Sequence, residues 1–180
     1  MMSFTGYANE INSGEIERCL SNYCFDKNRI VNSDLIKVLG EGYTRKGKSK
    51  FNCYVQSINN KRVYYQFMSH HDGEVRSLFV SYLPNCIKSH TPGRKIASPS
   101  TRLGLKLGDN VDKLLQILGS PEFIGNSTSI DFVGVKSEEL YQIKPFGEKM
   151  YVYGIEGDVL HNVFYISKGK IIGMKVSSFP

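Results

Sequence analysis

The chain has 180 residues, of which 41% are hydrophobic and 22% charged, and a formal net charge of +6. This length supports one large hydrophobic core or two small ones, and no apolar run approaches the roughly 20 residues that a membrane-spanning helix needs. The positive charge is divided between residues 1–90 (+4) and 91–180 (+2), which favours an acidic partner but falls short of a dedicated nucleic-acid-binding stripe.

The N-terminus has no basic stretch followed by an apolar one, so no signal peptide is visible. This fits a cytoplasmic protein, and it fits equally a mature extracytoplasmic domain whose leader has been removed. The sequence leaves both localisations open.

The first half of the chain predicts helices followed by strands. A first helix is expected over Ser13–Tyr23, and a second begins near Leu35 with Asn32 or Ser33 as its N-cap. Aromatic and β-branched residues then predict strands at 51–56, 62–68 and 75–82, separated by turn signals at 59–60 and 72–73. Residues 84–102 contain three prolines among Ser, Thr and basic residues, which indicates a linker.

The second half repeats this order more clearly. Asp109 is a good N-cap for a short amphipathic helix, which Gly119 ends. The residues expected on its buried face are Val111, Leu114, Leu115 and Leu118. Strands are predicted at 129–133, 150–155, 159–167 and 170–177. In the last of these, alternation places Ile172, Met174 and Val176 on one face and Ile171, Gly173 and Lys175 on the other.

The two halves therefore predict an α+β fold of two helix-plus-antiparallel-sheet repeats, with the helices packed on one face of a continuous sheet. The expected domains are a first repeat with its N-terminal helix at residues 1–83, a linker at 84–102, and a second repeat at 103–180.

Four cysteines, Cys19, Cys24, Cys53 and Cys86, are candidates for two disulfides with three possible pairings. Cys19 with Cys24 would close a short loop, and Cys53 with Cys86 would tie the first sheet to the segment that leaves it. Free buried thiols and a metal site are the alternatives, although the spacing lacks the close Cys pairs of zinc sites. Disulfides would place the protein outside the reducing cytosol.

The pattern Leu105-x-Leu-Gly-Asp-x5-Leu-x2-Leu-Gly-x-Pro121, followed by strands that end in Gly169-Lys-Ile-Ile-Gly173, resembles the small domains of BamE/SmpA-type outer-membrane assembly lipoproteins. Two such units in tandem resemble the beta-lactamase inhibitor protein (BLIP) family, in which the repeats form one curved sheet. The resemblance implies a non-enzymatic protein-binding module of the bacterial cell envelope or periplasm, which acts as an inhibitor, an immunity protein or an assembly factor.

Such a module would dock through a sheet face and its loops. Aromatic side chains supply much of the binding energy at protein interfaces, and a basic loop precedes the first predicted strand. The expected partner-binding residues are Tyr54, Tyr64, Tyr65, Arg45, Lys46, Lys48 and Lys50. The expected partner is another protein with an acidic surface, and neither a cofactor nor a metal is expected.

Two other classes of function remain as alternatives. The basic loop beside tyrosine-rich strands would suit a nucleic-acid-binding module. A small hydrolase or metal enzyme would need His70, His71, His161 and an acidic residue to converge in one pocket. The adjacent pair His70-His71 is expected in a solvated turn, with the side chains on opposite faces.

Overall fold

The computed structural model of the chain describes residues 18–25, 29–42, 50–84, 88–126, 147–154 and 160–178. At residues 160 and 161 it describes the backbone alone. Its elements are β1 (Cys19–Leu20), β2 (Tyr23–Cys24), α1 (Asn32–Leu39), β3 (Lys50–Ile58), β4 (Lys61–Ser69), β5 (Val75–Ser81), α2 (Val111–Leu118), β6 (Phe123–Gly125), β7 (Lys149–Tyr153), β8 (Leu160–Ser167) and β9 (Lys170–Ser178).

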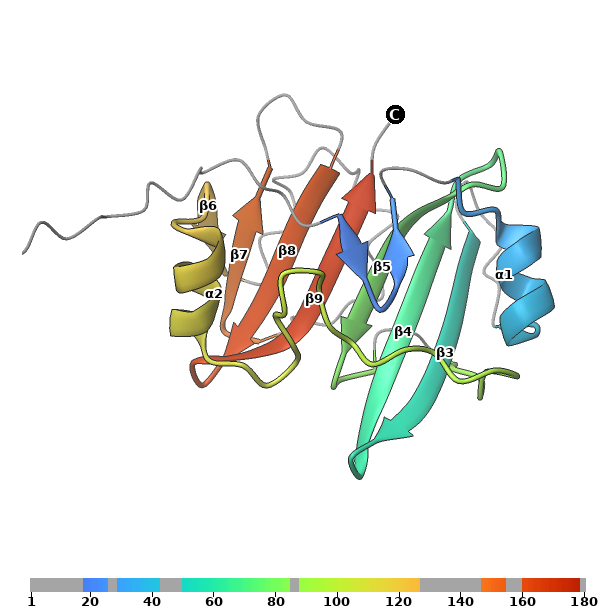
Figure 1. Cartoon of the computed structure of the whole chain (residues 1–180), viewed down its shortest axis with the longest axis horizontal. Coiled ribbons are helices and arrows are strands. Elements are labelled where there is room, and N and C mark those ends of the chain that lie inside the picture. The colour runs from blue at the N-terminus through green and yellow to red at the C-terminus, as the bar shows by residue number, and fades with distance from the viewer. Residues whose placement is uncertain are drawn as a thin grey trace, which may run out of the picture.

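The sequence prediction of two helix-plus-sheet repeats is wrong. Among the described residues, 49% are in strands and 13% in helices, so the protein is mostly β. Seven strands form one antiparallel sheet in the order β3-β4-β5-β9-β8-β7-β6, and β1 and β2 form a separate two-stranded sheet (Figure 1). The last strand, β9, pairs with β5 from the first half, so the two halves are not built as separate units.

A shared core is the physical reason for this difference. Leu35 and Leu39 of α1 belong to the same buried cluster as Leu114 and Leu118 of α2, together with side chains from β4, β5, β8 and β9. An eight-residue helix has too little apolar surface to be stable alone, so both helices depend on the common sheet. The domain boundaries expected at 83 and 103 stay predictions.

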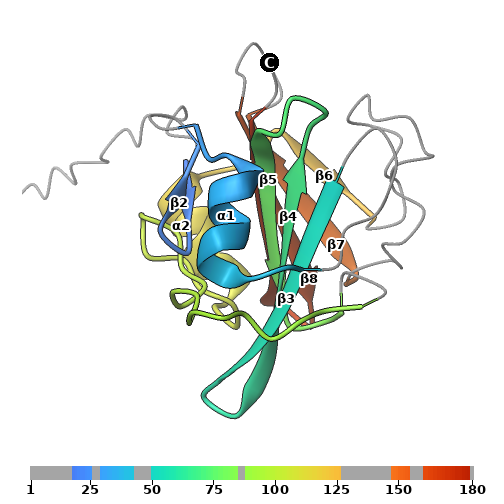
Figure 2. The same ribbon diagram turned by 90° about the vertical axis from the view of Figure 1, so that its right-hand side faces the viewer.

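The helices, the β1–β2 hairpin and the segment 93–110 lie on the same side of the seven-stranded sheet, which we call the helix side (Figure 2). The residues just before this segment run along the edge of β3, where His90 forms a bridge with Tyr54. The opposite side is called the outer face. It carries a smaller buried cluster of Phe79, Met150, Val152, Val163 and Tyr165.

Both helices differ from the sequence prediction at their N-termini. Val31 and Asn110 occupy the N-cap positions, and neither helix has a side-chain cap hydrogen bond. Asn32, an expected cap, instead accepts a hydrogen bond at its Oδ1 from Ser69 Oγ at 3.0 Å. The glycine at the end of α2 is confirmed, since Gly119 has φ +75° and donates its N–H to Leu115 O. Leu115, expected to be buried, is 37% exposed.

Residues 19–24 form a hairpin rather than the last part of the helix expected over 13–23; residues 13–17 lie outside the described ranges. Cys19 and Cys24 are disulfide-bonded with their Cα atoms 4.1 Å apart. In a helix, five residues rise by about 7.5 Å, so this crosslink is incompatible with a helix.

Five of the strands, β3, β4, β5, β7 and β8, confirm predicted segments of the sequence. The last predicted strand is also confirmed as β9, but its facing is not. A register shift beside Tyr165 and Ile166 leaves Ile172 outside the ladder, so Ile171 lies in the core with Met174 while Ile172 packs on the outer face. The sequence missed β6, and the strand expected at 129–133 lies outside the described residues.

Candidate functional site

Two of the predicted binding tyrosines are core residues. Tyr54 and Tyr65 are paired across β3 and β4, and both are 0% exposed. The Tyr54 hydroxyl donates to Gly40 O at 2.8 Å, and that of Tyr65 donates to Ala97 O at 3.1 Å while accepting from Gln56 Nε2 at 3.0 Å. Burial raises the pKa of each phenol to about 12. These tyrosines hold the helix side together and present no surface to a partner.

Tyr64, the third predicted tyrosine, points the other way. It lies on the outer face opposite Val55, and four residues along the strands Met68 lies opposite Phe51. We define the outer patch as the partly exposed side chains Phe51, Val55, Tyr64, Gln66 and Met68. β3 is an edge strand of the seven-stranded sheet, but it pairs with β4 along its whole length and β4 pairs in turn with β5, so this patch sits on a hydrogen-bonded support.

The predicted basic loop is described only at its last residue. Lys50 is exposed at the start of β3, next to Phe51 of the outer patch. Arg45, Lys46 and Lys48 lie outside the described residues. Lys50 lies opposite Ser69, at the other end of the β3–β4 pair from Tyr64, which lies opposite Val55.

The cysteines are oxidised wherever the structure describes them. Cys19 and Cys24 form a disulfide with an S–S distance of 2.07 Å, as one of the expected pairings requires. Cys53 is also disulfide-bonded, and no cysteine of the described ranges is free. Cys86 lies outside the described residues, so its pairing with Cys53 stays a prediction.

The histidines give little support to the alternative of an enzyme. The rings of His70 and His71 lie with their centroids 4.0 Å apart, so the expectation that they face opposite ways is wrong. The reason is that β4 ends at Ser69, which removes the strand alternation on which that expectation rested. The His161 backbone lies opposite Ser177 in the middle of the sheet. Within the described parts of the chain, no group of three or more His, Cys, Asp or Glu residues could hold a metal ion.

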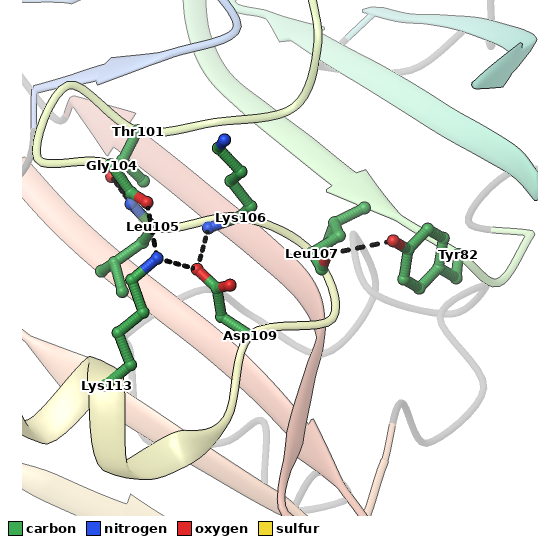
Figure 3. Close-up of polar contacts among 8 residues, drawn as sticks. All are labelled: Tyr82, Thr101, Gly104, Leu105, Lys106, Leu107, Asp109 and Lys113. Carbon is green, nitrogen blue, oxygen red and sulfur yellow. Dashed lines mark hydrogen bonds and ion pairs between the residues drawn. The ribbon is translucent and has the colours of Figure 1, made fainter. Parts of the chain in front are cut away.

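The Leu-x-Leu-Gly-Asp motif builds a turn rather than a ligand site (Figure 3). Asp109 Oδ2 accepts from the Lys106 N–H at 2.9 Å and from Lys113 Nζ at 2.7 Å. Lys113 Nζ also donates to Gly104 O at 3.0 Å, which ties the first turn of α2 to the segment before it. Leu105 and Leu107 point into the core. The carboxylate is therefore fully engaged in local structure.

The same turn is fastened to the sheet on both sides. The Tyr82 hydroxyl donates to Leu107 O at 3.0 Å, and the Gly108 N–H donates to Ile171 O at 2.7 Å. Gly108 has φ +92°, a left-handed conformation that disfavours other residues. The motif is thus explained by the route of the chain from the helix side into α2.

Lys175 is a single cation on the outer face of the central strand β9. It lies opposite Phe79 of β5 and Val163 of β8, so its flanking neighbours are apolar. Its side chain is partly exposed, but the surrounding protein desolvates the amino group and lowers the pKa of Lys175. The sequence prediction placed Lys175 on this face without recognising its surroundings.

Sequence reasoning missed where the net charge resides. Residues 75–108 contain six Lys and Arg residues and no Asp or Glu, while the rest of the chain has 17 of each sign. The whole net charge of +6 therefore comes from this stretch. Dividing the chain at residue 90 splits the stretch between the two halves and hides the signal.

Comparisons with protein-family models, with curated proteins and with solved structures gave no match to this chain. The resemblance to BamE/SmpA-type and BLIP-type domains thus stays a prediction that depends on the motif alone. Among the described residues, neither helix has the length and apolar character needed to cross a membrane.

Proposed function

We propose that the chain is a non-enzymatic protein-binding module of the bacterial cell envelope, acting as a protein inhibitor, an immunity protein or an assembly factor. It docks through the outer face of the sheet at β3 and β4. The outer patch is the observation that carries this proposal, because it presents two aromatic side chains, one aliphatic side chain, one thioether and one amide from paired strands.

The composition of the patch suits a protein interface. Tyr and Met are enriched in such interfaces, and a central tyrosine with apolar neighbours is a common source of binding energy. Tyr64 lies opposite Val55 at one end of the patch, and Met68 lies opposite Phe51 at the other end, beside the exposed Lys50. A partner with an apolar contact surface and a carboxylate at its margin complements this arrangement.

The disulfides support the expected compartment. The Cys19–Cys24 bond and the oxidised state of Cys53 fit a protein that matures in an oxidising environment. The periplasm is such an environment, so an extracytoplasmic site of action is favoured over the cytoplasm.

Affinity capture from an envelope extract tests the proposal. The purified chain is expected to retain one protein partner in stoichiometric amount. The double substitution Tyr64→Ala with Met68→Ala is expected to weaken that binding about 1000-fold by titration calorimetry, since two hot-spot truncations of about 2 kcal/mol each total about 4 kcal/mol. The control is Val38→Ala, the truncation of a residue that is 47% exposed on α1.

The control variant should bind as the wild type does, because α1 lies on the helix side. Co-purification of nucleic acid alone, or equal losses in the double variant and the control, would reject a protein-binding role for the outer patch. Circular dichroism of all three proteins establishes that they are folded.

A further inference from the structure

A second surface on the helix side carries the net charge of the protein. We define the basic segment as residues 88–106, which the structure describes throughout. Five of the six cations of the stretch 75–108 lie in it: Lys88, Arg94, Lys95, Arg102 and Lys106. All five side chains are exposed, and within the described part of the chain none of them has an ion-pair partner.

Carboxylates elsewhere in the described ranges do have partners. Asp34 pairs with Lys37, Asp72 and Glu74 pair with Arg76, and Asp109 pairs with Lys113. No acidic residue occurs between residues 75 and 108, so the five cations of the basic segment have no acidic neighbour along this part of the chain. Such a concentration of one sign attracts an anionic partner at long range.

The backbone of the basic segment is held in place before any partner arrives. His90 exchanges main-chain hydrogen bonds with Cys53 and Val55 at the edge of β3, and the Gly93 N–H donates to Leu39 O at 2.7 Å. Gln56 bonds both main-chain groups of Ile96, at 3.0 and 2.8 Å.

Side chains between the cations complete this anchoring. Ile96, Thr101 and Leu105 are buried at 1%, 5% and 0% exposure. The segment thus turns its apolar residues into the core and its cations to solvent. Binding to a fixed array of charges avoids part of the entropy cost of ordering a loop.

The chemistry of the segment favours acidic polypeptide over nucleic acid or lipid. Residues 88–106 contain no Phe, Tyr or Trp on which bases could stack. The N-terminus of each helix nearby already has its own carboxylate in the first turn, Asp34 in α1 and Asp112 in α2, which opposes a phosphate there. Arg94 and Arg102 each carry a planar guanidinium group, which can donate two parallel hydrogen bonds to one carboxylate.

We propose that the basic segment is a second docking surface, on the face opposite the outer patch, that binds an Asp- and Glu-rich polypeptide segment of a partner protein. Lys88 lies near the edge of β3, but the cations from Arg94 to Lys106 belong to the part of the segment that packs on the helix side through Ile96 and Leu105, so the sheet separates them from the outer patch. The partner on this side is recognised by charge, and its binding weakens as the salt concentration rises.

Fluorescence anisotropy with a labelled polyglutamate peptide tests this proposal on the full chain. The triple variant Arg94→Glu, Lys95→Glu, Arg102→Glu is expected to bind about tenfold or more weakly, and its salt dependence is expected to be flatter. The matched control is Lys149→Glu, Lys168→Glu, Lys170→Glu, which makes the same change in net charge at exposed positions on β7 and the β8–β9 turn.

The control is expected to bind within about threefold of the wild type, since net charge alone acts weakly at physiological salt. Equal losses in both triple variants would overturn the proposal, because binding would then follow net charge only. Tighter binding to an oligonucleotide or to anionic phospholipid vesicles than to polyglutamate would overturn it as well. The Tyr64→Ala, Met68→Ala variant is expected to bind polyglutamate normally, so a failure of the outer patch as an interface is distinguishable from a failure here.

Discussion

The two faces of the seven-stranded sheet both carry tyrosine side chains, which are buried on the helix side and partly exposed on the outer face at β4. Tyr65 and Tyr64 are neighbours on β4, yet Tyr65 is fully buried with its hydroxyl bonded to Ala97 O, and Tyr64 is partly exposed on the outer face. Alternation along a strand decides this, because successive side chains point to opposite faces. What lies above each face, rather than residue type, then determines whether a tyrosine stabilises the fold or is available to a partner.

The same contrast extends beyond the tyrosines. On the helix side, two helices and the basic segment cover one continuous core that joins both halves of the chain. On the outer face, the described buried cluster is confined to β5, β7 and β8, and the β3–β4 part stays partly exposed. Among the residues that the structure describes, the larger buried core therefore lies on the helix side of the sheet.

Truncating adjacent residues of β4 provides the largest test of this contrast. Phe67 is 0% exposed and packs edge-on against Tyr23 with ring centroids 4.9 Å apart, whereas Met68 is partly exposed on the outer face. Phe67→Ala is expected to lower the free energy of unfolding by about 3–5 kcal/mol, and Met68→Ala by about 1 kcal/mol or less. Urea denaturation of both variants measures the difference, and similar losses would mean that the outer face is as tightly packed as the core.

Alkaline titration tests the buried phenols. Folding raises the pKa of Tyr54 and Tyr65 from 10 to about 12, so the folded state keeps these protons longer than the unfolded chain does. The stability they contribute is complete below pH 10 and is lost as the pH rises from 10 through 12. Denaturation curves at a series of pH values are expected to show this fall, and Tyr54→Phe or Tyr65→Phe to make it shallower.

Lys175 acts with the opposite sign in this titration. Because folding lowers the pKa of Lys175, the unfolded state binds this proton more tightly than the folded state does. Lys175 therefore reduces the free energy of unfolding at low pH, and this reduction disappears as the pH rises toward 10.5, the ordinary pKa of lysine. Lys175→Met removes that contribution. A stability that did not decline above pH 10 in the wild type would contradict the burial of the phenols.

The motif turn gives the smallest expected effect. Asp109→Ala removes the acceptor for Lys106 N–H and Lys113 Nζ and is expected to cost about 1 kcal/mol of stability. Asp112→Ala, an exposed carboxylate in the first turn of α2, is expected to cost only a few tenths of a kcal/mol. Equal costs for the two would indicate that Asp109 acts through the helix dipole alone, and not through its hydrogen bonds.

Local patterns in the sequence were sufficient for much of the fold. Alternating apolar residues identified six strands, including β3 and β9, and Gly119 marked the end of α2 correctly. The turns at Asn59-Asn60 and Lys168-Gly169 have the positive φ angles that such residues tolerate. The candidate site was predicted less well, since of the predicted tyrosines only Tyr64 remains at a surface.

The amino-acid sequence by itself determined the strands, the turns and the two short helices, because these depend on side chains a few residues apart. It also held the concentration of charge in residues 75–108, which a count over the right window reveals. Only the tertiary structure decided that β5 and β9 pair, that Ile172 leaves the ladder, and that Tyr54 and Tyr65 face a covered side. Those outcomes depend on contacts between residues far apart in the chain, for which a single sequence has no local signal.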